Sequence, residues 1–580
     1  MAFLFRFVRA ALALLPLWLV TWALARRSRR RKVIGTVFLA GGLRETPSPA
    51  RSFGPDDGQP LFPLLRRLRR AGEDASVRAV ALRIGSLAGG WGQIEELRQE
   101  IGELRRRGRT VFAYLDRPGH AELLLASACD HVTVAPLASV ELVGLRAEVT
   151  FVKGLLDKVG VTPHFEAAGA FKSYGETFTR TSMSDEAREA LDLVLGGIHG
   201  GLVAGIAEGR DLDTDAVQEL VDGGPWSAEE ARERGLIDGV AYPDEWRRAM
   251  RRELGDVVPE PGESKEGATP RKDRHLLVEL RRWMRLRRWE HSLRRMVSPK
   301  RGVVVVPLEG SIVDSDAPYG PAGRIAPRPV RSLLRALRTD DDVAAVVLRV
   351  DSPGGSALAS DMLWHELRRL ARTKPLVASM GNVAASGGYY LAMAGDEVLA
   401  DALTITGSIG VVAGKFDGAA LLEKVGLSRD VLSYGAHSGM NSPSRGWTES
   451  ERERLRAHIA EVYGTFVGKA AACRGVEVDE LEPHARGRIW TGTQARERGL
   501  IDGVGSLEDA VRRAAVRAKL GADYDVWLAE TARPSLLDRV RQLPGTATRG
   551  GFELLGVDRD WLRAWQGAAQ ARMPFSLRIW

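Results

Sequence analysis

In the second half of the chain, apolar runs typical of buried strands alternate with segments that carry apolar residues at helical spacing. Residues 343–350 form an apolar run with the composition of a buried parallel strand, and residues 376–380 form another. Between them, residues 361–372 carry apolar side chains at helical spacing, at Met362, Leu363, Leu367 and Leu370. A second helical stretch, 387–394, follows the second strand. Strands and helices that alternate with short connections predict an α/β fold built from right-handed βαβ units.

The chain contains an internal duplication. The decamer Ala231–Val240 recurs without change at 495–504, an offset of 264 residues. Farther upstream, Val77–Arg83 matches Val343–Arg349 at an offset of 266 residues. Solenoid repeats have periods of about 20–50 residues, so this spacing indicates a duplicated domain. We therefore expect two tandem α/β repeats, each with parallel βαβ units.

Composition divides the chain further. Residues 255–274 are rich in Pro, Gly, Glu and Lys and are typical of a linker, whereas 274–297 is strongly basic with helical spacing. That helix either packs one face on a domain or lies on a membrane surface. The expected parts are a membrane anchor with a basic flank (1–32), a first α/β repeat (33–254), a linker with a basic amphipathic helix (255–300), a second α/β repeat (301–520) and a C-terminal tail (521–580).

An uncharged apolar segment lies near the N-terminus. Ala10–Ala25 has sixteen residues, which is shorter than the about 20 residues of a full membrane span. Ala23-Leu24-Ala25 has the small residues of a signal-peptide cleavage site, but six positive charges follow it directly and oppose export. We therefore expect an uncleaved transmembrane helix. The charge bias alone places the body of the protein in the cytoplasm.

The net charge of +8 comes from two short tracts. Residues 1–32 carry eight basic residues and no acid, and 271–301 carries twelve basic and three acidic residues, so the rest of the chain is net −9. Short basic tracts of this kind more often meet anionic lipid than a nucleic acid, and the sequence contains no nucleic-acid-binding motif. Cys129 and Cys473 form neither a disulfide framework nor a metal cluster, and both fit small buried positions.

Two glycine-rich turns in the second repeat carry the candidate chemistry. Asp351-Ser-Pro-Gly-Gly-Ser356 directly follows the strand 343–350, and Ala384-Ala-Ser-Gly-Gly-Tyr-Tyr390 lies between a strand and a helix. A serine on such a turn, here Ser386, is exposed to substrate beside helix N–H groups that stabilise a developing oxyanion. Tight packing of small residues would explain either turn alone. Two turns at the carboxyl ends of strands favour a site, because open α/β sheets bind ligands at that edge.

A serine nucleophile needs a base. The histidines of the second repeat lie in no recognisable catalytic context; they are His365, His437, His458 and His484. The alternative base is a lysine with a lowered pKa. Across the duplication Ser386 corresponds to His120, whereas Lys172 corresponds to Ser438. Each repeat therefore retains one half of a Ser–Lys dyad, with Lys172 as general base in the first repeat and Ser386 as nucleophile in the second.

These motifs resemble the signal peptide peptidase (protease IV) family in its long, two-repeat form. The resemblance covers roughly residues 75–520 and rests on four stretches: Phe171-Lys-Ser173, Asp351-Ser-Pro-Gly-Gly355, Ala384-Ala-Ser-Gly-Gly-Tyr389 and Thr406-Gly-Ser-Ile-Gly410. It implies a crotonase- or Clp-protease-like fold, with the lysine from the first repeat and the serine from the second. It further implies an oxyanion hole at the backbone N–H groups of Gly355 and Gly387, and a lysine-orienting hydroxyl at Ser408.

The resemblance also implies a biological setting. Members of this family are membrane-anchored serine endopeptidases that degrade cleaved signal peptides and other apolar peptides. They need no cofactor or metal and usually form bowl-shaped homotetramers. We therefore expect peptide substrates, membrane lipid and further copies of the chain as partners, at the inner (plasma) membrane, and no nucleic acid. The family's catalytic body faces outward, to the periplasm, although the basic residues after Ala25 oppose that orientation. We expect the outer face on the resemblance alone, with the cytoplasmic face as the alternative.

Two other functions fit parts of the pattern. A crotonase-type acyl-CoA enzyme would share the fold and the oxyanion hole, but it needs neither Ser386 nor Lys172. A non-catalytic membrane scaffold with a decayed site would not be expected to keep both residues. The sequence therefore favours a serine peptidase with a Ser–Lys dyad.

Overall fold

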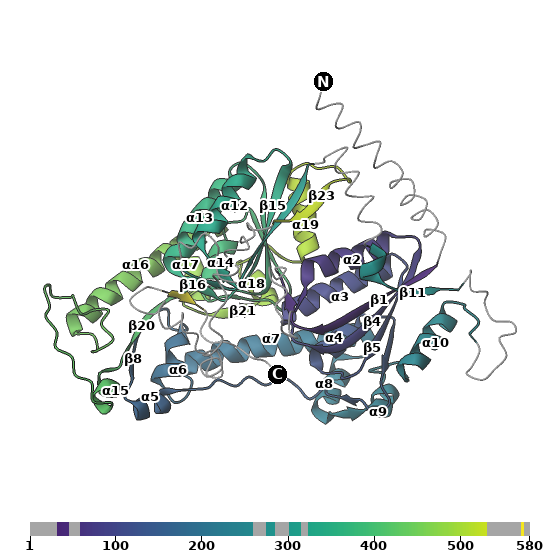
Figure 1. Cartoon of the computed structure of the whole chain (residues 1–580), viewed down its shortest axis with the longest axis horizontal. Coiled ribbons are helices and arrows are strands. Elements are labelled where there is room, and N and C mark those ends of the chain that lie inside the picture. The colour runs from purple at the N-terminus through teal and green to yellow at the C-terminus, as the bar shows by residue number, and fades with distance from the viewer. Residues whose placement is uncertain are drawn as a thin grey trace, which may run out of the picture. The chain divides into compact units, whose positions relative to one another are not determined.

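The structure is a computed structural model of the whole chain, and its described residues are 32–45, 58–258, 274–284, 301–314, 323–529 and the backbone of 570–572. The transmembrane helix expected at residues 10–25 lies outside them and stays a prediction. The chain divides into two compact units, whose elements Figure 1 labels. Unit 1 comprises Met1–Gly144 and Leu202–Lys300, and unit 2 comprises Leu145–Gly201 and Arg301–Trp580.

Unit 1 is built on a six-stranded parallel sheet. Its strand order is β10 (Gly239–Val240), β6 (His131–Val134), β5 (Thr110–Leu115), β4 (Val77–Leu87), β1 (Val33–Gly41) and β11 (Leu276–Glu279). Parallel neighbours need crossover connections, and helices provide them, namely α2 (Leu61–Glu73), α3 (Trp91–Arg106) and α4 (His120–Ser127). Helix α2 buries Leu61, Leu64, Leu65 and Leu68, which share one helix face.

Short pairs and helices complete unit 1. The two short strand pairs are β2 (Leu43–Arg44) with β3 (Gln59–Pro60), and β7 (Ser139–Val140) with β9 (Trp226–Ser227). The remaining helices are α8 (Thr214–Gly223), α9 (Ala228–Glu233) and α10 (Pro243–Glu253).

In the repeated decamer a helix ends before a left-handed glycine, which is Gly235 in the first copy and Gly499 in the second, and a short strand follows. Both copies of the decamer therefore have the same local structure, a helix end followed by a short strand.

Unit 2 contains the matching sheet of the second repeat. Its order is β22 (Gly503–Val504), β18 (Glu397–Ala400), β17 (Leu376–Ala385), β15 (Val343–Ser352), β12 (Gly302–Glu309) and β23 (Asp525–Leu528). Two further strands, β19 (Ile405–Gly407) and β21 (Ile489–Thr491), extend it from the far end of β17. Position by position this is the strand order of unit 1, and the predicted duplication of an α/β sheet is therefore confirmed.

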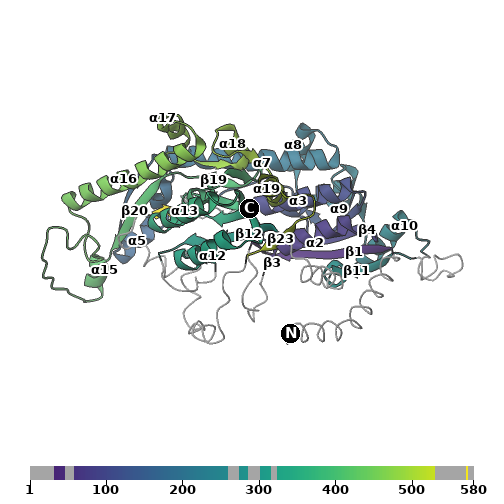
Figure 2. The ribbon, with the colours of Figure 1, turned by 90° about the horizontal axis from the view of Figure 1, so that it is seen from above.

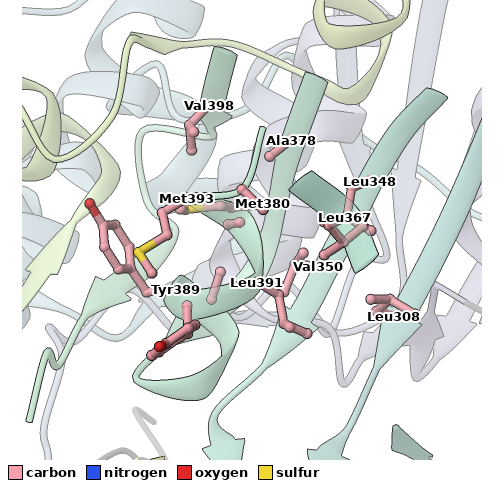
Figure 3. Packing of buried hydrophobic residues seen from close by; sticks show 14 of the residues in the cluster. Leu308, Leu348, Val350, Leu367, Ala378, Met380, Tyr389, Leu391, Met393 and Val398 are labelled. Carbon is pink, nitrogen blue, oxygen red and sulfur yellow. The ribbon is translucent and has the colours of Figure 1, made fainter. Parts of the chain in front are cut away.

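The core of unit 2 packs helices on this sheet. The predicted helices appear as α13 (Ala357–Ala371) and α14 (Gly387–Ala392), and α12 (Pro327–Thr339) joins them in one buried cluster. Figure 3 shows Leu348 and Val350 of β15 close to Leu367 of α13. Tyr389 of α14 is fully buried, and its hydroxyl donates to Leu500 O at 2.8 Å. Burial of this apolar surface fixes α14, and with it the turn that precedes it.

A second sheet in unit 2 joins residues of both repeats. Its order is β14 (Arg324–Ile325), β13 (Ser311–Ile312), β16 (Gly354–Ser356), β24 (Gln570–Arg572), β20 (Val411–Asp417) and β8 (Thr162–Ala168). Strand β8 belongs to the first repeat, and all seven of its residues pair antiparallel with β20. Helix α16 (Glu449–Arg474) lies along β20 in Figure 2 and packs Leu455 and Ile459 on Val411. Residues 145–201 of the first repeat are therefore part of unit 2.

Helix α7 (Asp185–Arg210) is shared between the units, with residues 185–201 in unit 2 and the remainder in unit 1. Among the described residues it is the one helix whose length and composition would allow it to cross a membrane, and half of its most apolar window is buried. Its buried positions recur at helical spacing, at Ala187, Leu191, Val194 and Ile198. This pattern is typical of a core helix.

The other helices of unit 2 are short: α5 (Lys153–Val159), α6 (Glu176–Thr179), α15 (Ala419–Lys424), α17 (Val478–Leu481), α18 (Gly492–Glu497) and α19 (Leu507–Arg517).

The basic helix expected over 274–297 is wrong at its start. Residues 276–279 instead form β11, which pairs parallel with β1 at the edge of the unit 1 sheet, and only 280–284 are helical among the described residues of this segment. The apolar run of β11 completes the sheet, and this pairing overrides the helical spacing. Trp283 lies in this segment and is buried, and its Nε1 donates to Asp74 Oδ2 at 3.2 Å. It therefore packs inside unit 1.

Candidate active site

Ser386 occupies a strained turn between a strand and a helix. Strand β17 ends at Ala385 and helix α14 begins at Gly387, so one residue makes the turn. Its φ of 57° and ψ of −115° lie in a region that residues with side chains rarely adopt. Its N–H donates to Gly407 O at 2.8 Å. The strain is maintained by the packed sheet and helix on either side, and it sets the direction of the Ser386 side chain.

Lys172 lies on the loop that follows β8. The N–H of Phe171 donates to Arg486 O at 2.8 Å, and the N–H of Lys172 donates to Gly169 O at 3.0 Å. Gly487 packs on this backbone so closely that a Cβ there would lie 2.5 Å from Lys172 N. The guanidinium carbon of Arg488 lies 3.5 Å from the centre of the Phe171 ring. The loop 486–488 therefore holds the lysine loop in place through backbone and side-chain contacts.

The Nζ of Lys172 has three oxygen neighbours. Ser386 Oγ lies 2.8 Å away, Ser408 O 2.9 Å and Ser408 Oγ 3.0 Å. A charged ammonium would donate to all three oxygens. A neutral amine would donate to the two oxygens of Ser408 and accept the hydroxyl proton of Ser386. Only the neutral amine can remove that proton, so the protonation state of Lys172 decides whether Ser386 is activated.

Burial favours the neutral amine. Lys172 is 3% exposed, and desolvation lowers its pKa well below the usual value for a lysine. Lys415 offers a comparison in the same unit, because it is equally buried and burial lowers its pKa too. Its Nζ, however, donates to Met440 O and Ser442 O, and not to a hydroxyl nucleophile. The environment of Lys172 thus combines a lowered pKa with a serine partner.

Ser408 and Gly410 shape the pocket of the lysine. Ser408 has a φ of 52°, and its N–H donates to Arg488 O at 2.6 Å. This conformation turns both its carbonyl oxygen and its hydroxyl toward Lys172 Nζ. A Cβ at Gly410 would lie 3.0 Å from Lys172 Cδ. The glycine therefore leaves room for the aliphatic part of the lysine side chain.

The two glycine-rich turns of the second repeat meet at one edge of the sheet. A Cβ at Gly387 would lie 3.2 Å from Gly354 Cα, and a Cβ at Gly355 would lie 1.9 Å from Ile312 O. Neither position has space for a side chain. The residues predicted to form the oxyanion hole, Gly355 and Gly387, are therefore on adjoining turns next to Ser386.

The structure places all five predicted site residues in one region of unit 2: Lys172, Gly355, Gly387, Ser386 and Ser408. Sequence reasoning missed the loop 486–488, since nothing in its pattern distinguishes Gly487 from other loop glycines. Gly410 had a signal, because it closes the motif that contains Ser408. In the part of the chain that the structure describes, no histidine ring of the second repeat hydrogen-bonds Ser386.

Ser386 lies on a strand-to-helix turn of an α/β fold, with glycine turns beside it and an amine at hydrogen-bond distance. This is the kind of arrangement that hydrolases with a serine nucleophile use. Comparison with protein families agrees: the model of Peptidase family S49 matches residues 103–256 and 368–521, once in each repeat. The chain belongs to peptidase family S49. This membership favours the peptidase over the acyl-CoA enzyme considered from the sequence.

Named relatives extend over most of the chain. "Serine protease SPPA, chloroplastic" of Arabidopsis thaliana is 33% identical over 507 residues, which cover 87% of this chain and 72% of that protein. "Protease 4" of Haemophilus influenzae is 29% identical over 471 residues, covering 78% and 72%. "Protease 4" of Salmonella typhi is 27% identical over 491 residues, covering 83% and 75%. Among solved structures, a point mutant of ClpP1 from Listeria monocytogenes gives a TM-score of 0.24 at 11% identity, covering 38% of this chain and 99% of that chain, which is too low to support an argument.

Proposed function

We propose that this protein is a serine endopeptidase with a Ser–Lys dyad, in which Ser386 is the nucleophile and Lys172 the general base. The observation that carries the proposal is the 2.8 Å separation between Lys172 Nζ and Ser386 Oγ. Burial of the amine and its lowered pKa support the role of base. The two contacts to Ser408 support an orienting role for that residue.

The proposed reaction has an acylation step and a deacylation step. Neutral Lys172 accepts the hydroxyl proton of Ser386 while Oγ bonds to the peptide carbonyl carbon, and the N–H groups of Gly355 and Gly387 stabilise the oxyanion. The protonated Lys172 gives this proton to the leaving amine as the C–N bond breaks. Water then loses a proton to Lys172 and attacks the acyl carbon. The bond from this carbon to Ser386 Oγ breaks, Lys172 returns the proton to Oγ, and the new carboxylic acid leaves.

The substrates we infer are extended apolar peptides, with cleaved signal peptides among them. A relative from Enterococcus faecium is named "Putative signal peptide peptidase SppA"; it is 35% identical over 179 residues, which cover 31% of this chain and 52% of that protein. The finer fold assignment, crotonase- or Clp-protease-like, belongs to the same proposal. It is supported by the parallel βαβ units and by the position of Ser386 after β17.

Labelling with a fluorophosphonate tests the proposal. We expect the reagent to modify Ser386 in the full-length protein, at a rate that rises with pH through the lowered pKa of Lys172 and then levels off. Below that pKa the ammonium cannot accept a proton, and above it the amine can. Mass spectrometry of the labelled peptide, measured across pH, gives the profile. A profile set by a group near about 6.5, unchanged in Lys172→Met, would indicate a histidine base instead.

We further propose that Ala10–Ala25 anchors the protein in the inner membrane, uncleaved, with the body on the outer face. The apolar composition of the segment supports the anchor, and the resemblance to outward-facing peptidases supports the orientation. We expect the protein in the membrane fraction, with its C-terminus digested by protease added to intact spheroplasts. Protection until lysis would place the site in the cytoplasm. A mature N-terminus at Arg26 would contradict the anchor itself.

A further inference from the structure

Arg488 covers the aromatic ring that precedes the lysine of the site. Its guanidinium carbon lies 3.5 Å from the centre of the Phe171 ring, and Phe171 adjoins Lys172 in the chain. Phe171 is 5% exposed, whereas the side chain of Arg488 is 23% exposed. The Nη1 of Arg488 also donates to Glu189 Oε1 of α7 at 2.5 Å. The arginine therefore lies between a buried ring and solvent, and an ion pair holds it there.

The backbone of Arg488 also holds the residue that orients the lysine. The N–H of Ser408 donates to Arg488 O at 2.6 Å. Ser408 in turn supplies two of the three oxygens around Lys172 Nζ. One arginine thus contacts the lysine pocket on two sides, through the Phe171 ring and through Ser408.

Exclusion of water sets the protonation state of Lys172. The residue is 3% exposed, and the cause of its lowered pKa is desolvation. Charged and titratable side chains also lie on the elements packed around it: Glu166 on β8, Glu176 on α6, Glu189 on α7, Lys415 on β20, and His484, Arg486 and Arg488 in or next to the loop 486–488. Among these described groups, no charge is a cause of the lowered pKa. A side chain that keeps water out of the pocket therefore controls the fraction of neutral amine.

We propose that Arg488 is a positioning residue: stacked on Phe171 and paired with Glu189, it keeps the lysine pocket closed to water and Lys172 Nζ on Ser386. This inference rests on the proposed peptidase function of the same site. Without the guanidinium, the Phe171 ring loses the group that covers it and water reaches the amine. A hydrated amine holds its proton more strongly, so the pKa of Lys172 rises toward its usual value. The neutral fraction at a given pH then falls, and the serine itself is unchanged.

The test is the pH profile of fluorophosphonate labelling of Ser386 in the full-length protein. It compares the parent with Arg488→Met, which keeps an unbranched apolar side chain and removes the guanidinium. Circular dichroism reports the fold, and Arg488→Lys, which keeps the charge, carries the comparison if Arg488→Met is unfolded. Arg498→Met is the matched control. The guanidinium carbon of Arg498 lies 4.1 Å from the centre of the Trp490 ring and its side chain is 25% exposed, but this ring does not adjoin the base in the chain.

We expect the midpoint of the profile to rise by about one pH unit in Arg488→Met, a fraction of the several units that burial can contribute. Well below the midpoint, labelling then slows by about tenfold. On the alkaline plateau it stays close to the parent, because the neutral amine is restored there. Hydrolysis of an internally quenched apolar peptide should show the same loss in kcat with KM unchanged. Arg488→Lys should shift the midpoint less in the same direction, and Arg498→Met should behave as the parent.

A double substitution distinguishes an effect through the ring from a direct effect of the charge. The charge of Arg488 could lower the pKa of a nearby lysine without any contact. If the arginine acts through Phe171, then Phe171→Leu raises the midpoint by itself, and adding Arg488→Met has no further effect. Additive shifts would show that the charge acts directly and would overturn the inference.

The remaining outcomes separate the inference from the proposed function. Equal midpoints for the parent and both Arg488 variants, with Ser386 labelled in each, would overturn the inference and leave the proposed function standing. A labelling profile that Lys172→Met leaves unchanged would contradict the proposed function, and the inference with it.

Discussion

Lys172→Met is expected to lower kcat/KM for an apolar signal peptide by at least about a thousandfold, and Ser386→Ala by as much or more. Lys172 Nζ is the group within hydrogen-bond distance of the serine hydroxyl, and Ser408 contributes only oxygens that the amine itself uses. Methionine keeps the length and apolar character of the lysine stem, so the buried pocket stays filled. Hydrolysis is followed by chromatography of the cleaved peptide, and circular dichroism reports the fold.

Lys415→Met is the matched control for this experiment. Lys415 is as buried as Lys172 and has a pKa lowered by the same cause, but it lies on β20 and bonds to backbone carbonyls. We expect its replacement to leave kcat within a few-fold of the parent. Turnover by Lys172→Met within about tenfold of the parent would contradict the proposal that Lys172 is the general base, because a general base contributes about a hundredfold or more.

A fragment of residues 301–580, which joins the second repeat to the C-terminal tail, is expected to be inactive although it contains Ser386. Its sequence lacks Lys172 and also lacks β8, whose seven residues pair with β20 in the intact chain. The serine would then have no base, and β20 would expose an unpaired edge. Fluorophosphonate labelling and peptide hydrolysis of the purified fragment measure the loss.

Co-expression with residues 145–201 provides the positive control. The two pieces together comprise the residues of unit 2, so we expect their complex to regain Ser386 labelling. The same segment carrying Lys172→Met should bind and fail to restore labelling. Robust hydrolysis by 301–580 alone would show that another group, such as one of its own histidines, serves as the base.

The proximity of Lys172 to Ser386 could be predicted because the duplication supplies an internal comparison. A position that keeps its chemistry in one copy and loses it in the other stands out against a shared framework, as at Ser386 with His120 and at Lys172 with Ser438. The strands and helices of the second repeat could be predicted from the spacing of apolar residues along the chain, since each element buries one face or both. These signals reside in short stretches of sequence.

Arg349 illustrates what local pattern does not show. It lies in the predicted strand 343–350, and that strand is confirmed, but its charged side chain is buried inside the sheet. Its Nη1 donates to Ser379 Oγ at 2.9 Å and to Met380 O at 3.0 Å, and the Asp401 carboxylate lies 3.9 Å away. A buried charge requires such partners. Ser379 and Met380 lie on β17 and Asp401 directly follows β18, all at least 30 residues away, so spacing along the chain gives no hint of them.

The same limit applies to the loop 486–488 and to β11. The loop acts on Lys172 from more than three hundred residues away in sequence, through backbone hydrogen bonds that any residue type can make. Strand β11 forms because β1 offers a free edge, although the local spacing favours a helix. In both cases the deciding partner is distant in the chain, and pairing with it outweighs local preference.

The pairing of β8 with β20 has a consequence during synthesis of the protein on the ribosome. The last residue of β8 is Ala168 and the last residue of β20 is Asp417, roughly 250 residues apart. At about 5–20 residues per second, the partner strand is completed on the order of 10–50 s after β8. Throughout that interval β8 has an open row of backbone donors and acceptors, which is prone to pairing with foreign strands. The nascent chain therefore spends this time with half of its future site made and unshielded.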